Sequence, residues 1–192
     1  MAYKSMREFM SKLEKAGELV RVSEPVSSVL EMTEIHRRLL ASGGPAVLFE
    51  NVIRADGERS SMPCLVNLFG TVKRVAMGVT LEGRERTTAG DLREVGELLA
   101  FLRQPEPPRG FRDALDMLPL AKTVMSMRPK TVTKAPVQEV VLTGDQIDLT
   151  KLPIQTCWPG EPAPLITWPL VVTKGPSDSR EDASTSASTA CR

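Results

Sequence analysis

The sequence predicts an α/β protein, in which a layered N-terminal domain is followed by a second, β-rich unit. In the N-terminal part, apolar residues recur at helical spacing in two segments, and short apolar runs typical of buried strands lie between and after them. From Val137 the helical pattern gives way to β-type runs that are separated by turn residues. The order helix, strand, helix, strand, strand indicates helices packed on a sheet.

The first five elements follow from periodicity and from stop signals. Gly17 ends the first helical pattern, and the run Ser42-Gly43-Gly44-Pro45 ends the second. A polar excursion through Asp56-Gly57 separates the last two strands. The predicted elements are a helix over 6–16, a strand over 18–22, a helix over 30–41 and buried strands over 46–49 and 64–68.

Further helices are predicted before the β-rich unit. Asp91 is the expected N-cap of a helix that runs to Leu102, with Glu94 completing a capping box. The run 111–127 predicts one or two short helices, because Pro119 interrupts it. A strand is expected over 137–142. The predicted domains are therefore residues 1–130 (α/β), 137–176 (the start of a β-rich domain) and 177–192 (a tail too polar to order).

Composition excludes several classes of function. Lys and Arg number 25 against 24 Asp and Glu, so no net field attracts nucleic acid or an anionic membrane. No apolar run is long enough for a transmembrane helix, and the N-terminus lacks a signal-peptide pattern, so a cytoplasmic location is expected. The three cysteines are far apart in the sequence and form no Cys-x-x-Cys pair, which predicts free thiols.

Few residues suggest chemistry by themselves. His36 is the only histidine and has no ligand-type neighbour at metal-binding spacing, so a structural role is expected for it. Cys157 has no nearby base to activate it as a nucleophile. The run Asn67-Leu-Phe-Gly70 matches no phosphate-binding loop and predicts a strand-to-helix turn that needs glycine. Trp158 and Trp168, set among prolines, are either core residues or a rigid wall for a flat ligand.

Several segments, in order, resemble the UbiD family of decarboxylases. Two of them, Leu152-Pro-Ile-Gln-Thr-Cys-Trp158 and Pro164-Leu-Ile-Thr-Trp168, are similar to the start of the family's flavin-reductase-like split β-barrel. The segments similar to its N-terminal α/β domain are Met6-Arg-Glu-Phe9, Gly17-Glu-Leu-Val-Arg21, Glu31-Met-Thr-Glu-Ile35, Gly44-Pro-Ala-Val-Leu-Phe-Glu-Asn51, Pro63-Cys-Leu-Val-Asn-Leu-Phe-Gly70 and Arg74-Val-Ala-Met-Gly78.

This resemblance implies non-oxidative decarboxylation of a hydroxybenzoate-like or related aromatic acid, in ubiquinone biosynthesis or aromatic catabolism. Prenylated FMN acts in the family as the electron sink when carbon dioxide leaves, together with a divalent metal such as manganese. The resemblance places Ile166, Thr167 and Trp168 near the cofactor cleft. No catalytic residue and no metal ligand carries over to this chain, and the barrel is expected to be incomplete. A non-catalytic binding or assembly module remains the alternative.

The residues from Ala183 to Arg192 depart from the family pattern. One base inserted before their codons permits the translation GFNLGIYRMQ, which is similar to the family segment that carries a metal-binding Asn and a catalytic Arg. Thr185 and Ala190 stand at those two places. We therefore expect a frameshifted C-terminus and an inactive N-terminal fragment. Full-length relatives are expected to be homo-oligomers, whereas here the uncovered apolar strand around Leu165–Val172 predicts self-association or aggregation.

Overall fold

The structure is a computed structural model of the chain, and it describes residues 3, 5–79, 86–103, 132–166, 170–173 and 185–188. The chain divides into two compact units. One comprises residues 1–89 together with 149–192, and the other comprises residues 90–148. This division differs from the domains that the sequence predicts, because residues 149–166 are grouped with the N-terminal α/β elements.

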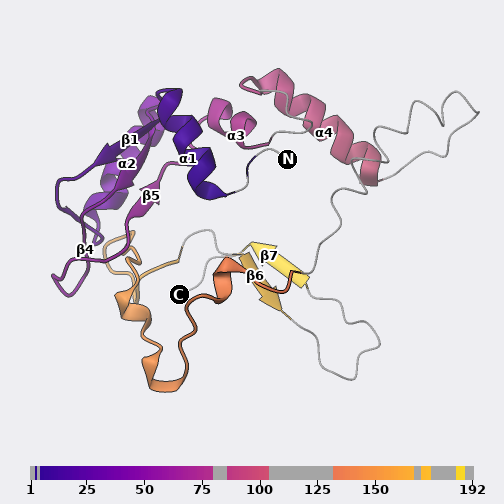
Figure 1. Cartoon of the computed structure of the whole chain (residues 1–192). Coiled ribbons are helices and arrows are strands. Elements are labelled where there is room, and N and C mark those ends of the chain that lie inside the picture. Colours follow the sequence, from indigo (N-terminus) through magenta and orange to yellow (C-terminus); the bar gives the residue numbers. More distant parts are fainter. Residues whose placement is uncertain are drawn as a thin grey trace, which may run out of the picture. The chain divides into compact units, whose positions relative to one another are not determined.

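A three-stranded sheet lies at the centre of the first unit (Figure 1). Its strand order is β1 (Leu19–Val22), β3 (Ala46–Phe49) and β5 (Cys64–Val66). β1 runs parallel to β3, and β5 runs antiparallel to it. A short parallel ladder pairs β2 (Val26–Ser27) with β4 (Val52–Ile53). The mixed α/β class that the sequence predicts is therefore confirmed.

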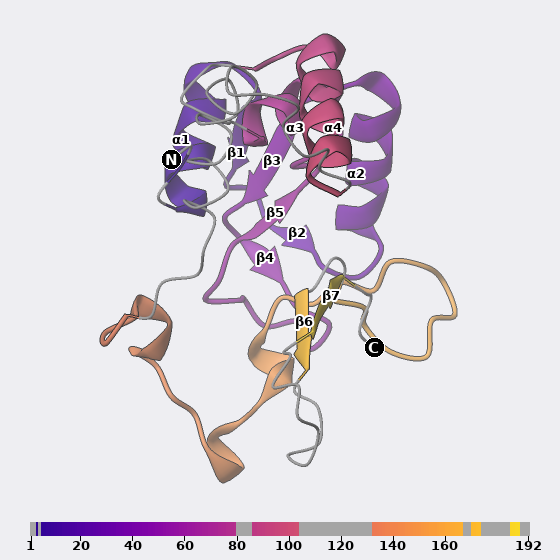
Figure 2. The same cartoon turned by 90° about the vertical axis from the view of Figure 1, so that its right-hand side faces the viewer.

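Helices cover both faces of this sheet, as Figure 2 shows for α1 and α2. α1 (Met6–Lys15) and α3 (Val72–Gly78) contribute to the core on one face, and α2 (Glu31–Ser42) contributes to the core on the other. Every residue of β3 is buried, because alternate side chains point into the two cores. The first core contains Phe9, Leu13, Leu19, Ala46, Leu48 and Met77, and the second contains Val26, Met32, Val47, Phe49, Val52 and Val66.

The ends of α1 and α2 follow the signals in the sequence. The Oγ of Ser5 caps α1 by accepting a hydrogen bond from the backbone N–H of Glu8 at 3.3 Å. Gly17 and Gly43 follow the two helices in the left-handed conformation, with φ values of 70° and 65°. Both predicted helices are thus confirmed to within one residue at each end.

Two local predictions are wrong. α4 (Ala89–Arg103) begins two residues before Asp91, so this carboxylate lies in the first turn, where it faces the positive end of the helix dipole, and is not the N-cap. Residues 137–142 do not form a strand. A 3-10 turn, η1 (Pro136–Gln138), starts this run, and no strand in the described ranges pairs with it, so its backbone lacks a sheet partner. The helices predicted within 111–127 lie outside the described residues.

The remaining elements are short. Two 3-10 turns, η2 (Gly144–Gln146) and η3 (Leu149–Lys151), precede an antiparallel pair of strands, β6 (Leu170–Thr173) and β7 (Thr185–Ser188). β7 lies within the tail that was expected to have no regular structure, and it pairs with an edge of β6 that was expected to be open. One antiparallel pair does not close a barrel.

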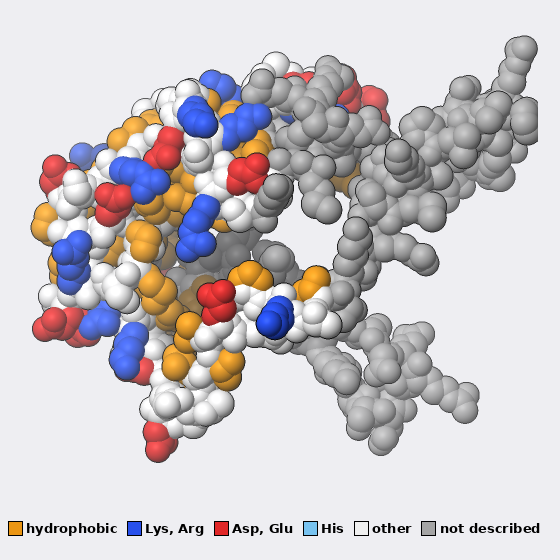
Figure 3. Space-filling model, viewed as in Figure 1, with side chains coloured by type: hydrophobic (Ala, Val, Ile, Leu, Met, Phe, Trp, Pro, Cys, Tyr) orange, Lys and Arg blue, Asp and Glu red, His pale blue; other side chains and the backbone are white. Residues whose placement is uncertain are grey.

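The described surface is mixed in charge. Figure 3 shows basic and acidic side chains interspersed over the visible face of the α/β unit. Apolar side chains are exposed in the segment 132–149, where Val137 is 85% exposed and Val140 is 75% exposed. In the part of the chain that the structure describes, no helix combines the length and the apolar character needed to cross a membrane.

Candidate functional site

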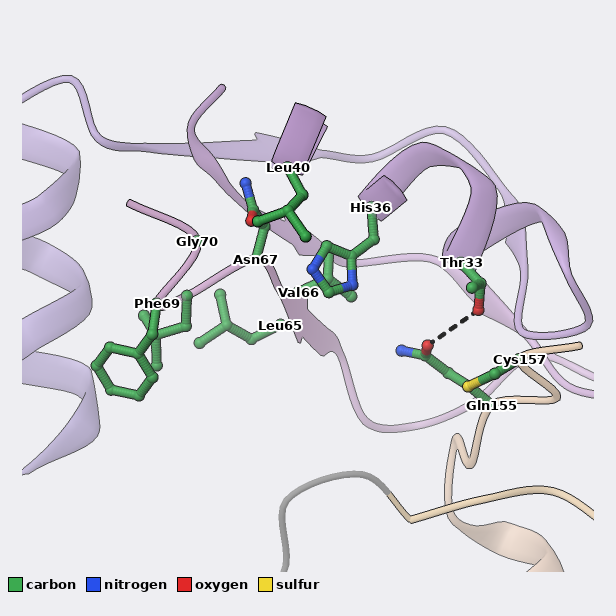
Figure 4. A pocket seen from close by; sticks show the side chains of 11 residues that line it. Thr33, His36, Leu40, Leu65, Val66, Asn67, Phe69, Gly70, Gln155 and Cys157 are labelled. Atoms are coloured by element: carbon green, nitrogen blue, oxygen red, sulfur yellow. Dashed lines mark hydrogen bonds between the residues drawn. The ribbon is translucent and has the colours of Figure 1, made fainter. Parts of the chain in front are cut away.

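A pocket of about 560 Å³ opens between α2, the end of β5 and the segment that contains Gln155 (Figure 4). Its size is in the range of small-molecule sites. Thr33, His36 and Leu40 line it from successive turns of α2, because helical residues three or four apart share a face. The remaining lining residues are Leu65, Val66, Asn67, Leu68, Phe69, Gly70, Gln155 and Cys157.

The pocket is uncharged. No Lys, Arg, Asp or Glu lines it, and burial lowers the pKa of His36 below its usual 6.5, because the imidazolium would lose hydration. At neutral pH the imidazole therefore offers one donor and one acceptor. Figure 4 shows the ring projecting from α2 toward Leu65 and Val66. Among the described contacts, no hydrogen bond joins His36 to Cys157, so the pocket contains no activated thiol pair.

The side chain of Gln155 forms one wall of this pocket. Its Nε2 lies 3.1 Å from the Sδ of Met32 and 3.3 Å from the Sγ of Cys64, and its Oε1 lies 3.5 Å from the hydroxyl of Thr33. These are weak hydrogen bonds, because sulfur is a poor acceptor. Burial raises the pKa of the Cys64 thiol, and the contact with Gln155 partly offsets this effect. Cys64 is therefore a neutral thiol covered by an amide.

The turn from β5 into α3 closes the opposite end of the pocket. Asn67 has a φ of 56°, and its Nδ2 donates hydrogen bonds to the carbonyl oxygens of Gly44 at 3.1 Å and Pro45 at 2.9 Å. Gly70 passes so close to Asn67 that a Cβ there would lie 1.8 Å from the Oδ1 of Asn67. This contact confirms the predicted turn and gives the physical reason for its glycine.

A fully buried arginine lies behind this turn. Arg74 donates from Nε to the carbonyl oxygen of Leu68 at 3.1 Å and from one terminal nitrogen to the carboxylate of Glu18 at 3.1 Å. Lys73 also contacts Glu18, at 2.7 Å. The bond from Lys73, with a further contribution from Arg74, lowers the pKa of Glu18 below its usual 4.5 although burial acts in the opposite direction. This cluster fixes α3 to the start of β1.

A second pocket of about 350 Å³ lies between the β4 loop and η3, within the same unit. It is lined by Arg54, Ala55, Asp56, Leu149, Thr150, Leu152, Ile154 and Pro164. Its one cation, Arg54, is paired with Asp56 at 2.8 Å. This pocket, like the first, therefore lacks an available cation for a phosphate group.

The structure describes only one of the three residues that the resemblance places at the cofactor cleft. Ile166 is 37% exposed and follows Leu165, which forms a single antiparallel bridge with Gln155. Thr167 and Trp168 lie outside the described residues. Trp158, which was expected in the core or in a ligand wall, is 57% exposed. Neither pocket fits a flavin mononucleotide, because neither offers a free cation to its phosphate.

The described residues contain no group of side chains that could bind a metal ion. No three His, Cys, Asp or Glu side chains among these residues approach one another closely enough to hold an ion. The two pockets described above have room for an uncharged group, but their lining offers no hydrogen-bonded pair of groups for acid–base or nucleophilic catalysis.

Sequence reasoning missed Gln155 and Arg74 as organising residues. Neither stands in a spacing that signals chemistry, and hydropathy assigns a polar residue to the surface by default. The family-like segments quoted above do contain both residues, so only the resemblance drew attention to their positions.

Two family models match the chain, one after the other. The N-terminal domain of 3-octaprenyl-4-hydroxybenzoate carboxy-lyase (UbiD) matches residues 10–99, and the Rift-related domain of the same enzyme matches residues 130–187. Together they span well over half of the chain. Residues 100–129 lie between the two matches.

Solved UbiD-class enzymes share the fold. Vanillic acid decarboxylase from Sedimentibacter hydroxybenzoicus, in its open form, is 22% identical with a TM-score of 0.68, and the match covers 98% of this chain and 34% of that one. Its closed form is 25% identical with a TM-score of 0.61, covering 91% and 31%. HmfF from Pelotomaculum thermopropionicum, in complex with FMN, is 22% identical with a TM-score of 0.63, covering 96% and 33%.

The chain spans about a third of the length of these enzymes. The likeness in structure extends over nearly all of this chain, and the two family models match it in the order of the family's domains. On these grounds the chain belongs to the UbiD family of carboxy-lyases.

Proposed function

We propose that this chain is the N-terminal part of a UbiD-type carboxy-lyase, which decarboxylates a hydroxybenzoate-like or related aromatic acid without net oxidation. The observation that carries the proposal is the order of the two family matches, over residues 10–99 and then 130–187. A role in ubiquinone biosynthesis or in aromatic catabolism fits this substrate class. A cytoplasmic location belongs to the proposal and fits the free thiols of Cys64 and Cys157.

In this proposal the α/β unit is a scaffold, and Ile166, Thr167 and Trp168 form one edge of the cofactor cleft. The cofactor is prenylated FMN with a divalent metal such as manganese, and two of the similar structures contain FMN or prenylated FMN. The exposure of Ile166 is compatible with a cleft-lining position. The two pockets described above do not supply the rest of the cleft, because they offer the flavin phosphate no free cation.

We further infer that the polypeptide is inactive as it stands. Thr185 and Ala190 occupy the places where the resemblance sets a metal-binding Asn and a catalytic Arg. Neither a threonine hydroxyl nor an alanine methyl replaces those groups, since one is a weak metal ligand and the other carries no charge. The frameshift predicts specific codons for Ala183–Arg192. The coding DNA tests this inference directly, and codons incompatible with the shifted frame would exclude it.

Cofactor titration tests the main proposal. The chain, and a version with the reading frame restored and continued to family length, are each titrated with prenylated FMN and manganese and then incubated with a panel of aromatic acids. The restored protein should bind the flavin and release carbon dioxide, and the present chain should do neither. A restored, flavin-loaded protein that is inert toward the whole panel would refute the proposed reaction.

The alternative function is a non-catalytic binding or assembly module on the same fold. Flavin absorbance distinguishes it from the decarboxylase, which must bind the cofactor. A restored protein that folds and forms oligomers without taking up flavin would favour the module. For the present chain we propose self-association, because apolar side chains of the segment 132–149 are largely exposed. Homo-oligomers are expected for the full-length form.

A further inference from the structure

The segment 153–157 is attached to the edge of the α/β unit by two backbone hydrogen bonds. The N–H of Leu30 donates to the carbonyl oxygen of Thr156 at 3.0 Å, and the N–H of Thr156 donates to the carbonyl oxygen of Ser28 at 3.0 Å. Val29 and Thr156 thus form a parallel bridge beyond the end of β2. A segment more than a hundred residues further along the chain thus adds one isolated β-bridge to this edge. We call residues 153–157 the strap.

Leu30, which donates one of these bonds, has a strained backbone. Its φ of 64° and ψ of −42°, with the N–H of Glu31 donating to the carbonyl oxygen of Val29 at 2.7 Å, define a γ-turn that side-chain-bearing residues seldom adopt. A strained residue persists where its surroundings hold it in place. Here the surroundings include Glu31, whose carboxylate accepts from the N–H of Ser27 at 2.8 Å, and the strap itself.

Gln155 joins the strap to two different partners. Its side chain reaches inward to Met32, Thr33 and Cys64 of the α/β unit. Its carbonyl oxygen accepts a hydrogen bond from the N–H of Leu165 at 2.8 Å. One residue therefore links the α/β core to the short run that leads from Leu165 through Ile166.

The loop between these paired residues is also constrained. The carboxylate of Glu161 accepts hydrogen bonds from the N–H groups of Cys157 at 2.7 Å and Trp158 at 3.2 Å. The loop therefore leaves the strap in a defined direction, and Leu165 returns to Gln155 across it. The side chain of Gln155 therefore acts together with the two backbone hydrogen bonds of Thr156 to hold Leu165 and Ile166 relative to the sheet.

We propose that Gln155 is a positioning residue, which holds the run at Leu165–Ile166 against the α/β unit and thereby sets where the first cofactor-side residues begin. The importance of this location for catalysis rests on the proposed function. The anchoring itself does not, because every contact that carries it lies within the described part of this chain. If the side chain of Gln155 only filled space, shortening it would leave the amide of Leu165 protected from hydrogen exchange.

The test compares Gln155→Ala with Gln146→Ala in a background that carries Cys157→Ser and Cys191→Ser, so that Cys64 is the single thiol. Gln146 is the matched control, because it is a glutamine whose side chain accepts a bond from the nearby N–H of Thr143 in the other unit. Hydrogen exchange is followed at the amides of Leu30, Thr156 and Leu165, and Cys64 is labelled with a thiol reagent. The amide of Ser28, bonded to Ile53 inside the unit, reports on global opening.

Gln155→Ala should speed exchange at Thr156 and Leu165, and labelling of Cys64, by tenfold or more, while exchange at Ser28 stays within twofold. Gln146→Ala should change none of these rates. Faster Cys64 labelling with unchanged exchange at Leu165 would overturn the proposal, because Gln155 would then only fill space. Equal acceleration at Ser28 would also overturn it, since the effect would be general destabilisation.

A milder variant keeps the test decisive if Gln155→Ala fails to fold. Thr33→Val removes only the hydroxyl that contacts the Gln155 amide. It should speed hydrogen exchange at Leu165 by a smaller factor than removal of the Gln155 side chain would. If Gln155→Ala does not fold, no change at Leu165 in Thr33→Val would by itself refute the anchoring. Failure of the proposed reaction would appear separately, as a restored protein inert toward aromatic acids, with these exchange rates unaffected.

Discussion

Gly70→Ala provides the sharpest test of the packing between β5 and α3. A Cβ at this position would lie 1.8 Å from the Oδ1 of Asn67, 2.7 Å from its Cγ and 3.0 Å from a terminal nitrogen of Arg74. The Asn67 amide cannot rotate away without cost, because its Nδ2 holds the carbonyl oxygens of Gly44 and Pro45. Arg74 is fully buried and has no room to retreat.

The expected loss follows from these contacts. Two hydrogen bonds at about 1 kcal/mol each give roughly 2 kcal/mol, and overpacking of a filled site adds about 1–3 kcal/mol. We therefore expect the free energy of unfolding to fall by about 3–5 kcal/mol. Domain stabilities are about 5–15 kcal/mol, so the loss is large. Urea unfolding followed by circular dichroism measures it, and the melting temperature should fall by about 4 °C per kcal/mol.

Two controls isolate the cause. Gly96 lies within α4 with no heavy atom within 4 Å of a Cβ placed there, so Gly96→Ala should stabilise its helix by up to about 1 kcal/mol. In an Asn67→Ala background the two shortest contacts are gone and only the 3.0 Å approach to Arg74 remains, so Gly70→Ala should then cost clearly less than it does in the parent chain. A Gly70→Ala chain as stable as the parent, or an equal cost in both backgrounds, would refute the argument.

Three further predictions concern pH and surface. The pKa of Glu18 lies below 4.5 in the folded chain, so its stabilising effect is complete above about pH 4.5 and is lost as the pH falls further. In Glu18→Gln the free energy of unfolding should therefore depend less on pH below about 4.5. Burial lowers the pKa of His36 below 6.5, so protonation favours the unfolded chain, and His36→Gln should remove the part of the stability loss that begins as the pH falls below about 6.5. Val140→Lys should lower light scattering by the chain and Thr133→Lys, which adds the same charge at an exposed polar residue of the same segment, should not; equal effects would exclude an apolar cause.

The sequence was most predictive where one physical signal decides the structure. The helices over 6–15 and 31–42 have apolar stripes and glycine stops, and both were located to within one residue. The run at 137–142 has a strand-like pattern but no strand partner in the described ranges, and strand pairing is not encoded locally. The start of α4 was misplaced because Asp91 is as favourable in the first turn as it is at the cap.

The candidate site was less predictable than the fold, and the reason lies in the kind of residue that builds it. Asn67 and Gln155 are both uncharged amides that join segments distant in sequence, one holding Gly44 and Pro45 and the other reaching Met32 and Cys64. An amide donates and accepts at once without the desolvation cost of a charge, so it can enter an apolar region where Lys or Glu cannot. Hydropathy assigns both residues to the surface, and no spacing rule marks them. The contacts that fix the strap therefore emerge only when the chain has folded and brought their partners within reach.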